Sequence, residues 1–141
     1  MTQEPIEMRY GNEGVNWPEL ERLFAVAGLH GRIGDKLRRA FENSQVTCYA
    51  YASSRIVGVG RALTDWEYHA FIYDVAVHPD FQKQGIGSLL IQGILDRVSV
   101  WRVMLVASSD VQPFYAKFDF AEHTGVRARL DWNKLSDHSE Q

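Results

Sequence analysis

The feature that most constrains this chain is a strand followed at once by a loop with two glycines and then a helix. In the stretch Tyr73–Leu90, a β-branched and aromatic run ends at Pro79, and Gly85 and Gly87 precede an apolar stripe of helical spacing. The first backbone N–H groups of a helix have no partner within it, and the helix dipole adds partial positive charge there. Glycines let a bulky anion approach that backbone closely. The stretch therefore predicts a site for a phosphate or diphosphate group.

The spacing of the glycines excludes two common phosphate loops. A Walker A loop needs Lys-Ser or Lys-Thr directly after its last glycine, whereas Gly87 is followed by Ser88 and Leu89. A dinucleotide fingerprint needs a third glycine three residues after Gly87, and that position is Leu90. What remains is the pattern Gln82-x-x-Gly85-x-Gly87.

Hydrophobic periodicity and turn residues predict the other elements. Helices are expected at Asn16–Gly28, Asp35–Glu42, Gly85 to about Val100, and Gln112–Phe118. Strands are expected at Ile6–Tyr10, Val46–Ala52, Ile56–Leu63, Ala70–Val77 and Val103–Ala107. Alternation in Arg127–Trp132 predicts a closing strand, and an extra strand after Phe120 is left open.

Length and composition set the class of protein. A chain of 141 residues predicts one domain, residues 1–135, with a flexible C-terminal tail at 136–141. A single cysteine, Cys48, allows no intrachain disulfide and suits a reducing cytoplasm. A net charge of −3 argues against nucleic-acid binding, and no apolar run or signal peptide points to a membrane or to export. None of the five histidines shows metal-ligand spacing, so no metal site is expected.

Two blocks of the sequence resemble the GCN5-related N-acetyltransferase (GNAT) superfamily, as a short single-domain member. The strand end Val75–Pro79 with the following glycine loop is similar to the family's Gln/Arg-x-x-Gly-x-Gly/Ala block. The second block, Pro113–Phe120, reads PFYAKFDF and looks like the family's Tyr-containing block. One departure is Asp119, where the family has a glycine; a left-handed conformation there is one that Asp tolerates.

The resemblance implies an α+β fold, an α/β/α sandwich. Its central sheet is mixed and mostly antiparallel, with helices on both faces and a splayed parallel strand pair. It also implies that acetyl-coenzyme A is the cofactor, with its pantetheine arm added to the splayed strand like a further strand. The residues that the resemblance assigns to the cofactor are Val75, Ala76, Val77, Gln82, Lys83, Gln84, Gly85, Ile86, Gly87, Ser88, Ser108, Phe114 and Lys117.

Catalysis is assigned to two residues. Tyr115 matches the family position that protonates the departing thiolate, and a phenol with a pKa of about 10 can hydrogen-bond a thiolate whose acid has a pKa of about 8.5. Asp74, which strand alternation points away from Tyr73 and Val75, is a candidate base for the amine. Tyr73 is a rival, and a water relay without a dedicated base stays open.

The acceptor is predicted only as a class. His30 and Tyr73 are candidate substrate-binding residues, and the aromatic and acidic side chains near Tyr73 suit an aromatic or alkyl amine. The expected activity is N-acetylation of a small primary amine, such as an arylalkylamine, or of a protein amino group. The alternatives are a non-catalytic acyl-coenzyme A sensor and a nucleotide-binding module of another kind. A homodimer is expected as well.

Overall fold

A computed structural model describes residues 4–135 of the chain. In chain order, the elements are β1 (Ile6–Tyr10), α1 (Trp17–Ala27), α2 (Gly34–Glu42), β2 (Val46–Ala52), β3 (Arg55–Thr64), β4 (His69–Val77), the 3-10 turn η1 (Pro79–Phe81), α3 (Ile86–Leu95), β5 (Arg102–Met104), α4 (Gln112–Ala116) and the 3-10 turn η2 (Trp132–Lys134). Each strand and helix that was expected before Phe120 is present, but two are shorter than expected. β5 ends at Met104, whereas the expected strand ran to Ala107, and α4 ends at Ala116, whereas the expected helix ran to Phe118. The strand ends early because its pairing with β4 stops at Met104. The predicted tail at 136–141 lies outside the described residues.

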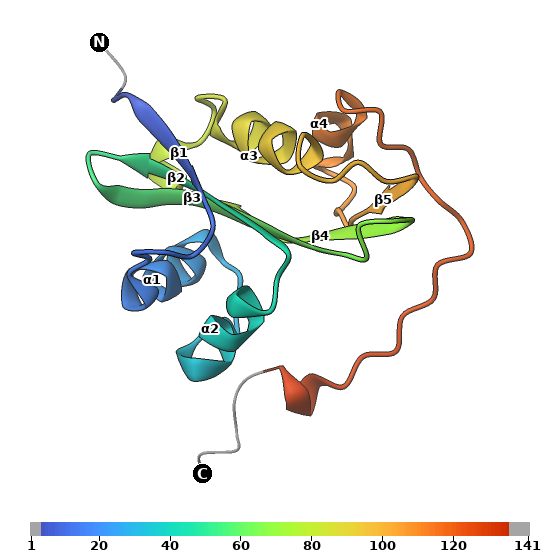
Figure 1. The fold of residues 1–141 in the computed structure, drawn as a ribbon, viewed down its shortest axis with the longest axis horizontal. Helices are drawn as coiled ribbons and strands as arrows, with labels where there is room; N and C mark the ends of the chain where they lie inside the picture. The colour runs from blue at the N-terminus through green and yellow to red at the C-terminus, as the bar shows by residue number, and fades with distance from the viewer. Residues whose placement is uncertain (1–3, 136–141) are drawn as a thin grey trace.

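The strands form one sheet in the order β1-β2-β3-β4-β5 (Figure 1). The first four strands are antiparallel to their neighbours, and a tight turn with Ser53 and Ser54 at positive φ joins β2 to β3. β5 is parallel to β4 and pairs with it only over His69–Phe71 and Arg102–Met104. The predicted mixed, mostly antiparallel sheet with a splayed parallel pair is therefore confirmed.

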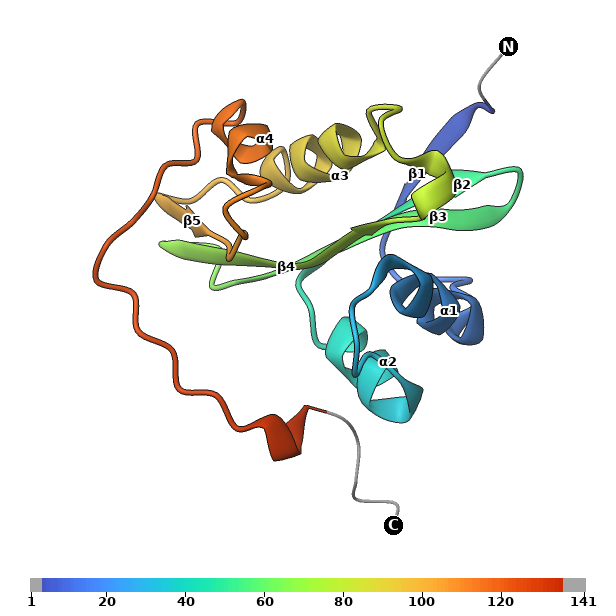
Figure 2. The same cartoon turned by 180° about the vertical axis from the view of Figure 1, so that it is seen from behind.

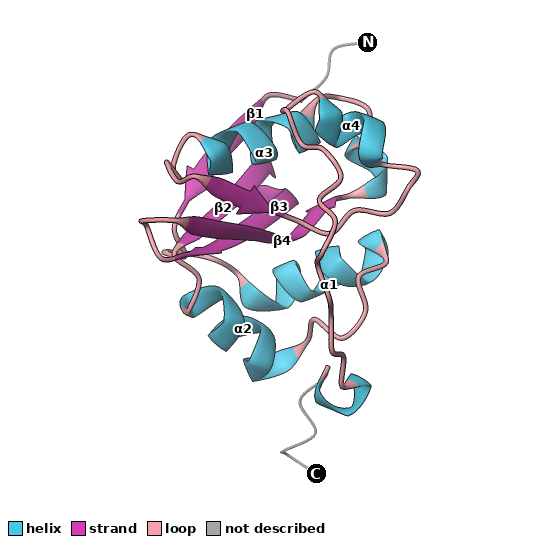
Figure 3. Ribbon diagram, turned by 90° about the vertical axis from the view of Figure 1, so that its right-hand side faces the viewer, coloured by secondary structure: helices cyan, strands magenta, loops and turns pink. Residues whose placement is uncertain are grey.

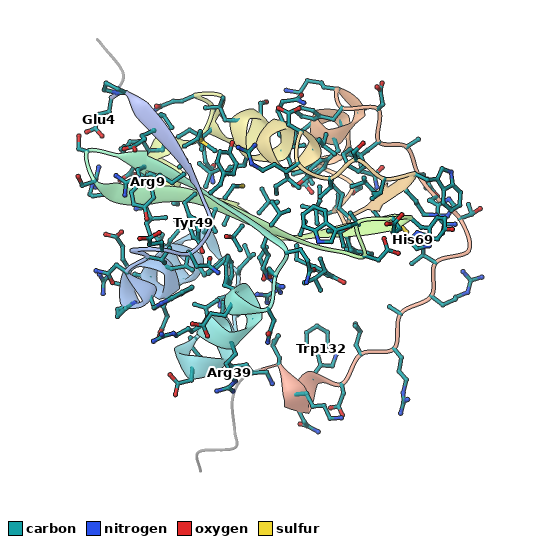
Figure 4. The ribbon with its side chains drawn as sticks, in the orientation of Figure 1. Glu4, Arg9, Arg39, Tyr49, His69 and Trp132 are labelled. Atoms are coloured by element: carbon teal, nitrogen blue, oxygen red, sulfur yellow. The ribbon has the colours of Figure 1, made fainter. Side chains whose placement is uncertain are left out.

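Helices cover both faces of the sheet, with α1 and α2 on one side and α3 and α4 on the other (Figures 1 and 3). Successive side chains of β2 point to opposite faces. Ala50 packs with Leu90 beneath α3, whereas Tyr49 packs with Phe24 and Phe41. Figure 4 shows Tyr49 on the side of the sheet that faces α1 and α2. Both faces of β2 are thus buried, which explains why every one of its residues is buried.

The helix ends follow their capping residues. The Asn16 side chain accepts a hydrogen bond from the Glu19 N–H at the start of α1, and Gly28 ends that helix in a left-handed conformation. α3 ends at Leu95, earlier than the predicted Val100. Val98 is buried, but it reaches the core from the turn after the helix. The apolar spacing therefore predicted correctly that Val98 is buried, but it wrongly predicted that Val98 is part of the helix.

The C-terminal part of the chain differs from the prediction. No strand forms at Arg127–Trp132 or directly after Phe120 within the described residues. Instead, residues 121–131 leave the layer of α3 and α4, pass outside β5 and reach the layer of α1 and α2 (Figures 1 and 2). The alternation of Arg127–Trp132 fits a strand, but a strand also needs a partner to pair with its backbone, and residues 4–135 place none beside this segment.

No helix between residues 4 and 135 has both the length and the hydropathy needed to cross a bilayer.

Gly58 sets how closely α3 approaches the sheet. It lies opposite Val77 at the end of β4, and a Cβ at this position would lie 2.8 Å from Ile86 Cγ2 and 3.2 Å from Ala50 Cβ. Ile86 is the first residue of α3, so the missing side chain allows the opening turn of the helix to rest on the strand end. Gly58 therefore adjoins both ends of the glycine loop: it pairs with Val77 before the loop, and Ile86 after the loop packs on it.

Replacing Gly58 by alanine is expected to destabilise the fold. The added methyl group overpacks the contact with Ile86, and the free energy of unfolding falls by about 1–3 kcal/mol. Urea unfolding measures the change. Gly60→Ala is the matched control, because its Cβ would lie 3.1 Å from Ile94 Cδ1 and should cost less. Equal stability of Gly58→Ala and the wild-type protein would contradict the proposed contact.

Candidate functional site

The opening turn of α3 has free hydrogen-bond donors. Lys83 and Gly85 both have positive φ, 63° and 84°, and Gly85 caps the helix without a side-chain hydrogen bond. Within residues 4–135, the N–H groups of Gly85–Ser88 donate no hydrogen bond. Donors of this kind at a helix N-terminus suit an anion. The predicted anion site therefore has the geometry that its chemistry requires.

The second sequence block, Pro113–Phe120, contacts the opening turn of α3 through residues of α4. A Cβ on Gly87 would lie 3.3 Å from Phe114 Cζ, so the glycine lets the Phe114 ring lie against the first turn of α3. The Lys117 ammonium lies 4.6 Å from the centroid of the same ring. The left-handed Asp119, with φ 67°, follows as expected. The fold thus gathers Gly87, Phe114 and Lys117, which the sequence assigned to one ligand.

Gln82 is turned toward the strand end. Its side-chain amide donates to the Val77 carbonyl oxygen at 3.3 Å. The Lys83 and Gln84 positions that follow form the loop before Gly85, and the Lys83 side chain is exposed. Gln82 therefore ties the loop to β4 in this structure.

The edge of β4 that faces β5 is free beyond Phe71. Pairing with β5 stops at the Phe71 and Met104 pair, and residues 72–77 have no backbone partner on that side within the described chain. Val75 and Val77 pack against the core beneath α3, and the Ala76 side chain packs on the opposite face. Ser108, exposed in the loop after β5, lines neither cavity at this gap, and its hydroxyl donates to Asp110 at 2.6 Å. An extended ligand could pair with this open edge.

A bulge interrupts β4 at Asp74. Arg61 of β3 lies opposite Tyr73, whereas Val59 lies opposite Ala76, so the two strands lose register between them. Asp74 has φ 58°, in the left-handed region that a residue other than glycine seldom adopts. The expected alternation is therefore wrong here: Tyr73 lies over Arg61, and Asp74 binds the same arginine. A bulge places consecutive side chains on one face of the sheet.

Two arginines hold the Asp74 carboxylate. Arg32, from the loop between α1 and α2, donates through Nη2 to Oδ1 at 2.7 Å, and Arg61 donates through Nε to Oδ2 at 2.9 Å. The Asp74 side chain is 4% exposed. Both carboxylate oxygens are engaged, so the ion pairs tie β4 to β3 and to the loop before α2.

A cavity of about 250 Å³ lies where β4 and β5 separate. It brings together the predicted Tyr115, Asp74, Tyr73 and Val75. The remaining lining residues are Leu29, Arg32, Phe71, Ile72, Leu105 and Val106. The exposed His30 does not line it, although the His30 carbonyl oxygen accepts a hydrogen bond from Arg32. The structure thus joins the two predicted catalytic residues and leaves the His30 side chain outside.

Tyr115 is the phenol in this cavity. Burial raises its pKa above the ordinary value. Its ring meets Phe114 and Phe120 edge to face, at centroid distances of 5.0 and 6.0 Å. Burial alone accounts for this shift, without a hydrogen bond to the hydroxyl from another group in the described part of the chain. Tyr115 therefore stays protonated at neutral pH and has a proton to donate to a group in the cavity.

The sequence reasoning missed two contributors to the site. Arg32 and Arg61 lie outside both motifs, and only the folded chain brings them to Asp74. The aromatic side chains near Tyr73, Phe71 among them, were expected to form a wall from their positions in the sequence. Phe71 stacks on Tyr73 with a centroid distance of 4.6 Å.

Other reactive groups do not form a competing site. Cys48 is buried, and burial raises the pKa of its thiol to about 12, so it is not a nucleophile at neutral pH. Among residues 4–135, no group of three or more His, Cys, Asp or Glu side chains is placed to hold a metal ion.

Comparison with known proteins identifies a family model and relatives that this chain resembles. The family model described as an acetyltransferase (GNAT) domain matches residues 9–134. The uncharacterised N-acetyltransferase ycf52 of Pyropia yezoensis is 34% identical over 116 residues, which are 77% of this chain and 67% of the relative. Serotonin N-acetyltransferase 2, chloroplastic, of Oryza sativa subsp. japonica is 30% identical over 81% of this chain and 60% of its own length.

Solved structures share the fold. A probable acetyltransferase from meticillin-resistant Staphylococcus aureus has a TM-score of 0.79 at 24% identity and covers 90% of this chain and 98% of its own. A GNAT-family acetyltransferase from Streptococcus pneumoniae has a TM-score of 0.76 at 25% identity, covering 89% and 98%. The overall fold of this chain is thus one that these proteins share.

Replacing Asp74 by asparagine tests the arginine clamp. The variant keeps the shape of the side chain and loses the charge that faces Arg32 and Arg61, so the free energy of unfolding is expected to fall by about 1–3 kcal/mol. Urea unfolding measures it. Asp35→Asn, at an exposed position in the first turn of α2, is the control and should cost less. Unchanged stability together with lost turnover would instead favour Asp74 as a base.

Proposed function

The chain belongs to the GNAT family of acetyltransferases, and on this premise we propose that it transfers the acetyl group of acetyl-coenzyme A to a primary amine. Three features of the structure support this most: free amides at the start of α3, a free edge of β4, and the half-buried phenol of Tyr115 in the small cavity. When bound, acetyl-coenzyme A supplies a thioester whose carbonyl carbon the amine attacks, with the thiolate as leaving group.

The diphosphate of coenzyme A fits the opening turn of α3. The backbone N–H groups between Gln84 and Ser88 are the donors, and the helix dipole favours the negative charge. The Lys117 ammonium, held over Phe114 beside Gly87, and the exposed Lys83 add positive charge. Gln82 supports the loop through its bond to Val77.

The pantetheine arm fits the free edge of β4. Its amides can pair with the backbone of Val75, Ala76 and Val77 as an added strand would. This direction brings the thioester end toward the cavity that contains Tyr115.

Tyr115 is proposed as the proton donor to the departing thiolate. Its raised pKa keeps the phenol protonated, and a phenol is a sufficient hydrogen-bond donor for a thiolate. The free hydroxyl in the small cavity has no competing partner in the described residues. The proton that Tyr115 gives up is recovered from solvent or from the protonated amide product.

Two routes can remove the proton of the acceptor amine. Asp74 remains a candidate base, but its two oxygens already accept hydrogen bonds from Arg32 and Arg61. The Arg32 side chain lines the same cavity, and a nearby positive charge favours the neutral form of a bound amine. A water relay assisted by this charge is therefore the alternative to direct proton transfer.

The aromatic wall supports an acceptor with a flat or apolar body. Phe71 and Tyr73 stack along the cavity, and Tyr73 is 37% exposed and open to a ligand. An arylalkylamine suits this wall. A protein amino group is the other acceptor class, and one relative, histone acetyltransferase TAP1 of Glycine max, is named for a protein substrate. A cytoplasmic location stays a prediction, since some relatives are chloroplastic.

A panel of primary amines with acetyl-coenzyme A tests the proposed function. Release of free thiol that depends on both substrates is the expected result, and arylalkylamines and lysine peptides are the two informative groups. Thermal shifts with coenzyme A, ATP and NAD accompany the panel, because a bound ligand stabilises the folded state. Stabilisation by coenzyme A without turnover of any amine would point to a sensor, and preferential stabilisation by ATP or NAD would contradict coenzyme A binding.

Ser88→Asp tests the diphosphate site separately from the fold. A carboxylate in the first turn of α3 suits the helix dipole, so the melting temperature should not fall. The same charge repels the diphosphate, and the affinity for coenzyme A is expected to fall about tenfold or more. Calorimetric titration with coenzyme A measures it, with the uncharged Ser88→Asn as the control. Equal affinities for the two variants would rule out this position for the diphosphate.

Tyr115→Phe tests the proton donor. Loss of the hydroxyl is expected to lower kcat by about 100-fold or more while coenzyme A affinity changes little. Because burial raises the Tyr115 pKa, loss of its proton should not limit kcat of the wild-type enzyme below a pH of about 10. Tyr68→Phe, at an exposed tyrosine before β4, is the control. A full kcat in Tyr115→Phe would exclude the role.

A further inference from the structure

The Arg32 guanidinium has hydrogen-bond donors to spare at the small cavity. A guanidinium carries five N–H donors. Three of them are used: Nε and Nη2 donate to Asp74 Oδ1 at 3.1 and 2.7 Å, and Nη1 donates to the His30 carbonyl oxygen at 2.8 Å. The Arg32 side chain is 31% exposed and lines the cavity of about 250 Å³. Two of its N–H groups therefore remain for a ligand.

The charges beside this cavity do not balance. Arg32 and Arg61 both form an ion pair with Asp74, whose side chain is 4% exposed. Neither arginine forms an ion pair with a second acid within residues 4–135, and the further partner of Arg61 is the neutral Ser44 hydroxyl at 3.3 Å. One positive charge is therefore left uncompensated, and Arg32 is the arginine that lines the cavity.

A protonated amine finds no available carboxylate in the small cavity. Asp74 is the one acid among the described residues that line it, and both of its oxygens accept hydrogen bonds from arginine. The next acid, Glu122, lines a larger cavity of about 590 Å³ that extends along residues 103–107 and α4, and its side chain is exposed to screening solvent. A simple alkylammonium ion would thus meet the charge of Arg32 with little to offset it.

We propose that the acceptor amine also carries an anionic group, a carboxylate or a phosphate, and that Arg32 binds this group. The inference rests on the proposed function, since it specifies the class of amine that is acetylated. The planar guanidinium matches the oxygen atoms of either anion, and hydrogen bonds between charged groups are the strong ones. An acid on the acceptor balances the uncompensated charge, so the molecule enters the cavity without a net electrostatic cost.

The walls of the small cavity fit such an acceptor. Arg32 and Tyr115 line the same cavity, so one small molecule can present its acid to the first and its amine to the thioester beside the second. The stacked rings of Phe71 and Tyr73 provide a surface for the body of the molecule. An aromatic amino acid combines these three features. An aminoalkyl phosphate supplies the same charge from another source.

Two sets of matched acceptors test the proposal on the wild-type protein. Phenethylamine has no acid, phenylalanine adds a carboxylate beside the amine, and phenylalaninamide replaces that carboxylate by a neutral amide. Ethanolamine and ethanolamine phosphate form the second set. Calorimetric titration, with and without coenzyme A, measures affinity without turnover.

The acid-bearing member of at least one set should bind about tenfold or more tightly than its relatives, and the set in which it does so tells carboxylate from phosphate. The gain should shrink at high salt, because Arg32 is partly exposed. No gain in either set would overturn the proposal. Tightest binding of phenylalaninamide would also overturn it, because that amine is the less basic one and a low basicity would then explain the preference.

Variants of Arg32 test the residue itself. Arg32→Gln removes the charge, so the affinity for the acid-bearing amine should fall about tenfold or more, whereas the affinity for the amine without an acid should not fall. Arg32→Lys keeps the charge and should keep part of the preference. Melting temperatures check that both variants fold, and the salt dependence of the wild-type protein supplies the test if they do not. A preference that survives Arg32→Gln in full would contradict the assignment.

Binding and turnover are measured separately, so the two proposals fail separately. Acid-dependent binding without release of thiol would refute acetyl transfer and leave the anion site standing. Release of thiol with amines of every charge alike would support acetyl transfer and refute the anion site.

Discussion

The ion pairs between one buried carboxylate and two arginines underlie the geometry of the site. Asp74 adopts a left-handed conformation that costs free energy in a strand, and its contacts with Arg32 and Arg61 offset that cost. The bulge that it forms shifts the register of β4 against β3 and lies on the stretch that no longer pairs with β5. The lining of the small cavity depends on this arrangement, because a regular strand would have kept Tyr73 and Asp74 on opposite faces of the sheet.

A second constraint acts at the opposite end of the gap. Gly58 lets α3 rest on the sheet, and Gly87 lets α4 rest on α3. The donors at the helix N-terminus, the aromatic Phe114 and the cation of Lys117 are brought together by these two close approaches. The two glycines, one in the core and one in the first turn of α3, thereby fix where these groups lie relative to each other.

How far the sequence predicted the site depends on the range of each signal. Gly85, Gly87 and Tyr115 lie in local blocks whose spacing is itself informative, and the structure brings those blocks together. Arg32 and Arg61 are separated from Asp74 by 42 and 13 residues, and no local pattern distinguishes them from surface arginines. His30 was selected by its place between two helices, but its neighbour Arg32 is the residue that reaches the cavity.

The sequence by itself determined the order of the elements through Met104, the caps of α1, and the loop that leads into α3. These depend on periodicity, on capping side chains and on glycine, all of which act within a few residues. Only the tertiary structure decided that Asp74 shares a face with Tyr73 and that β5 pairs over three residues. It also decided that Arg127–Trp132 has no strand beside it among the described residues. Backbone pairing is a contact between two segments, and an alternating pattern describes only one of them.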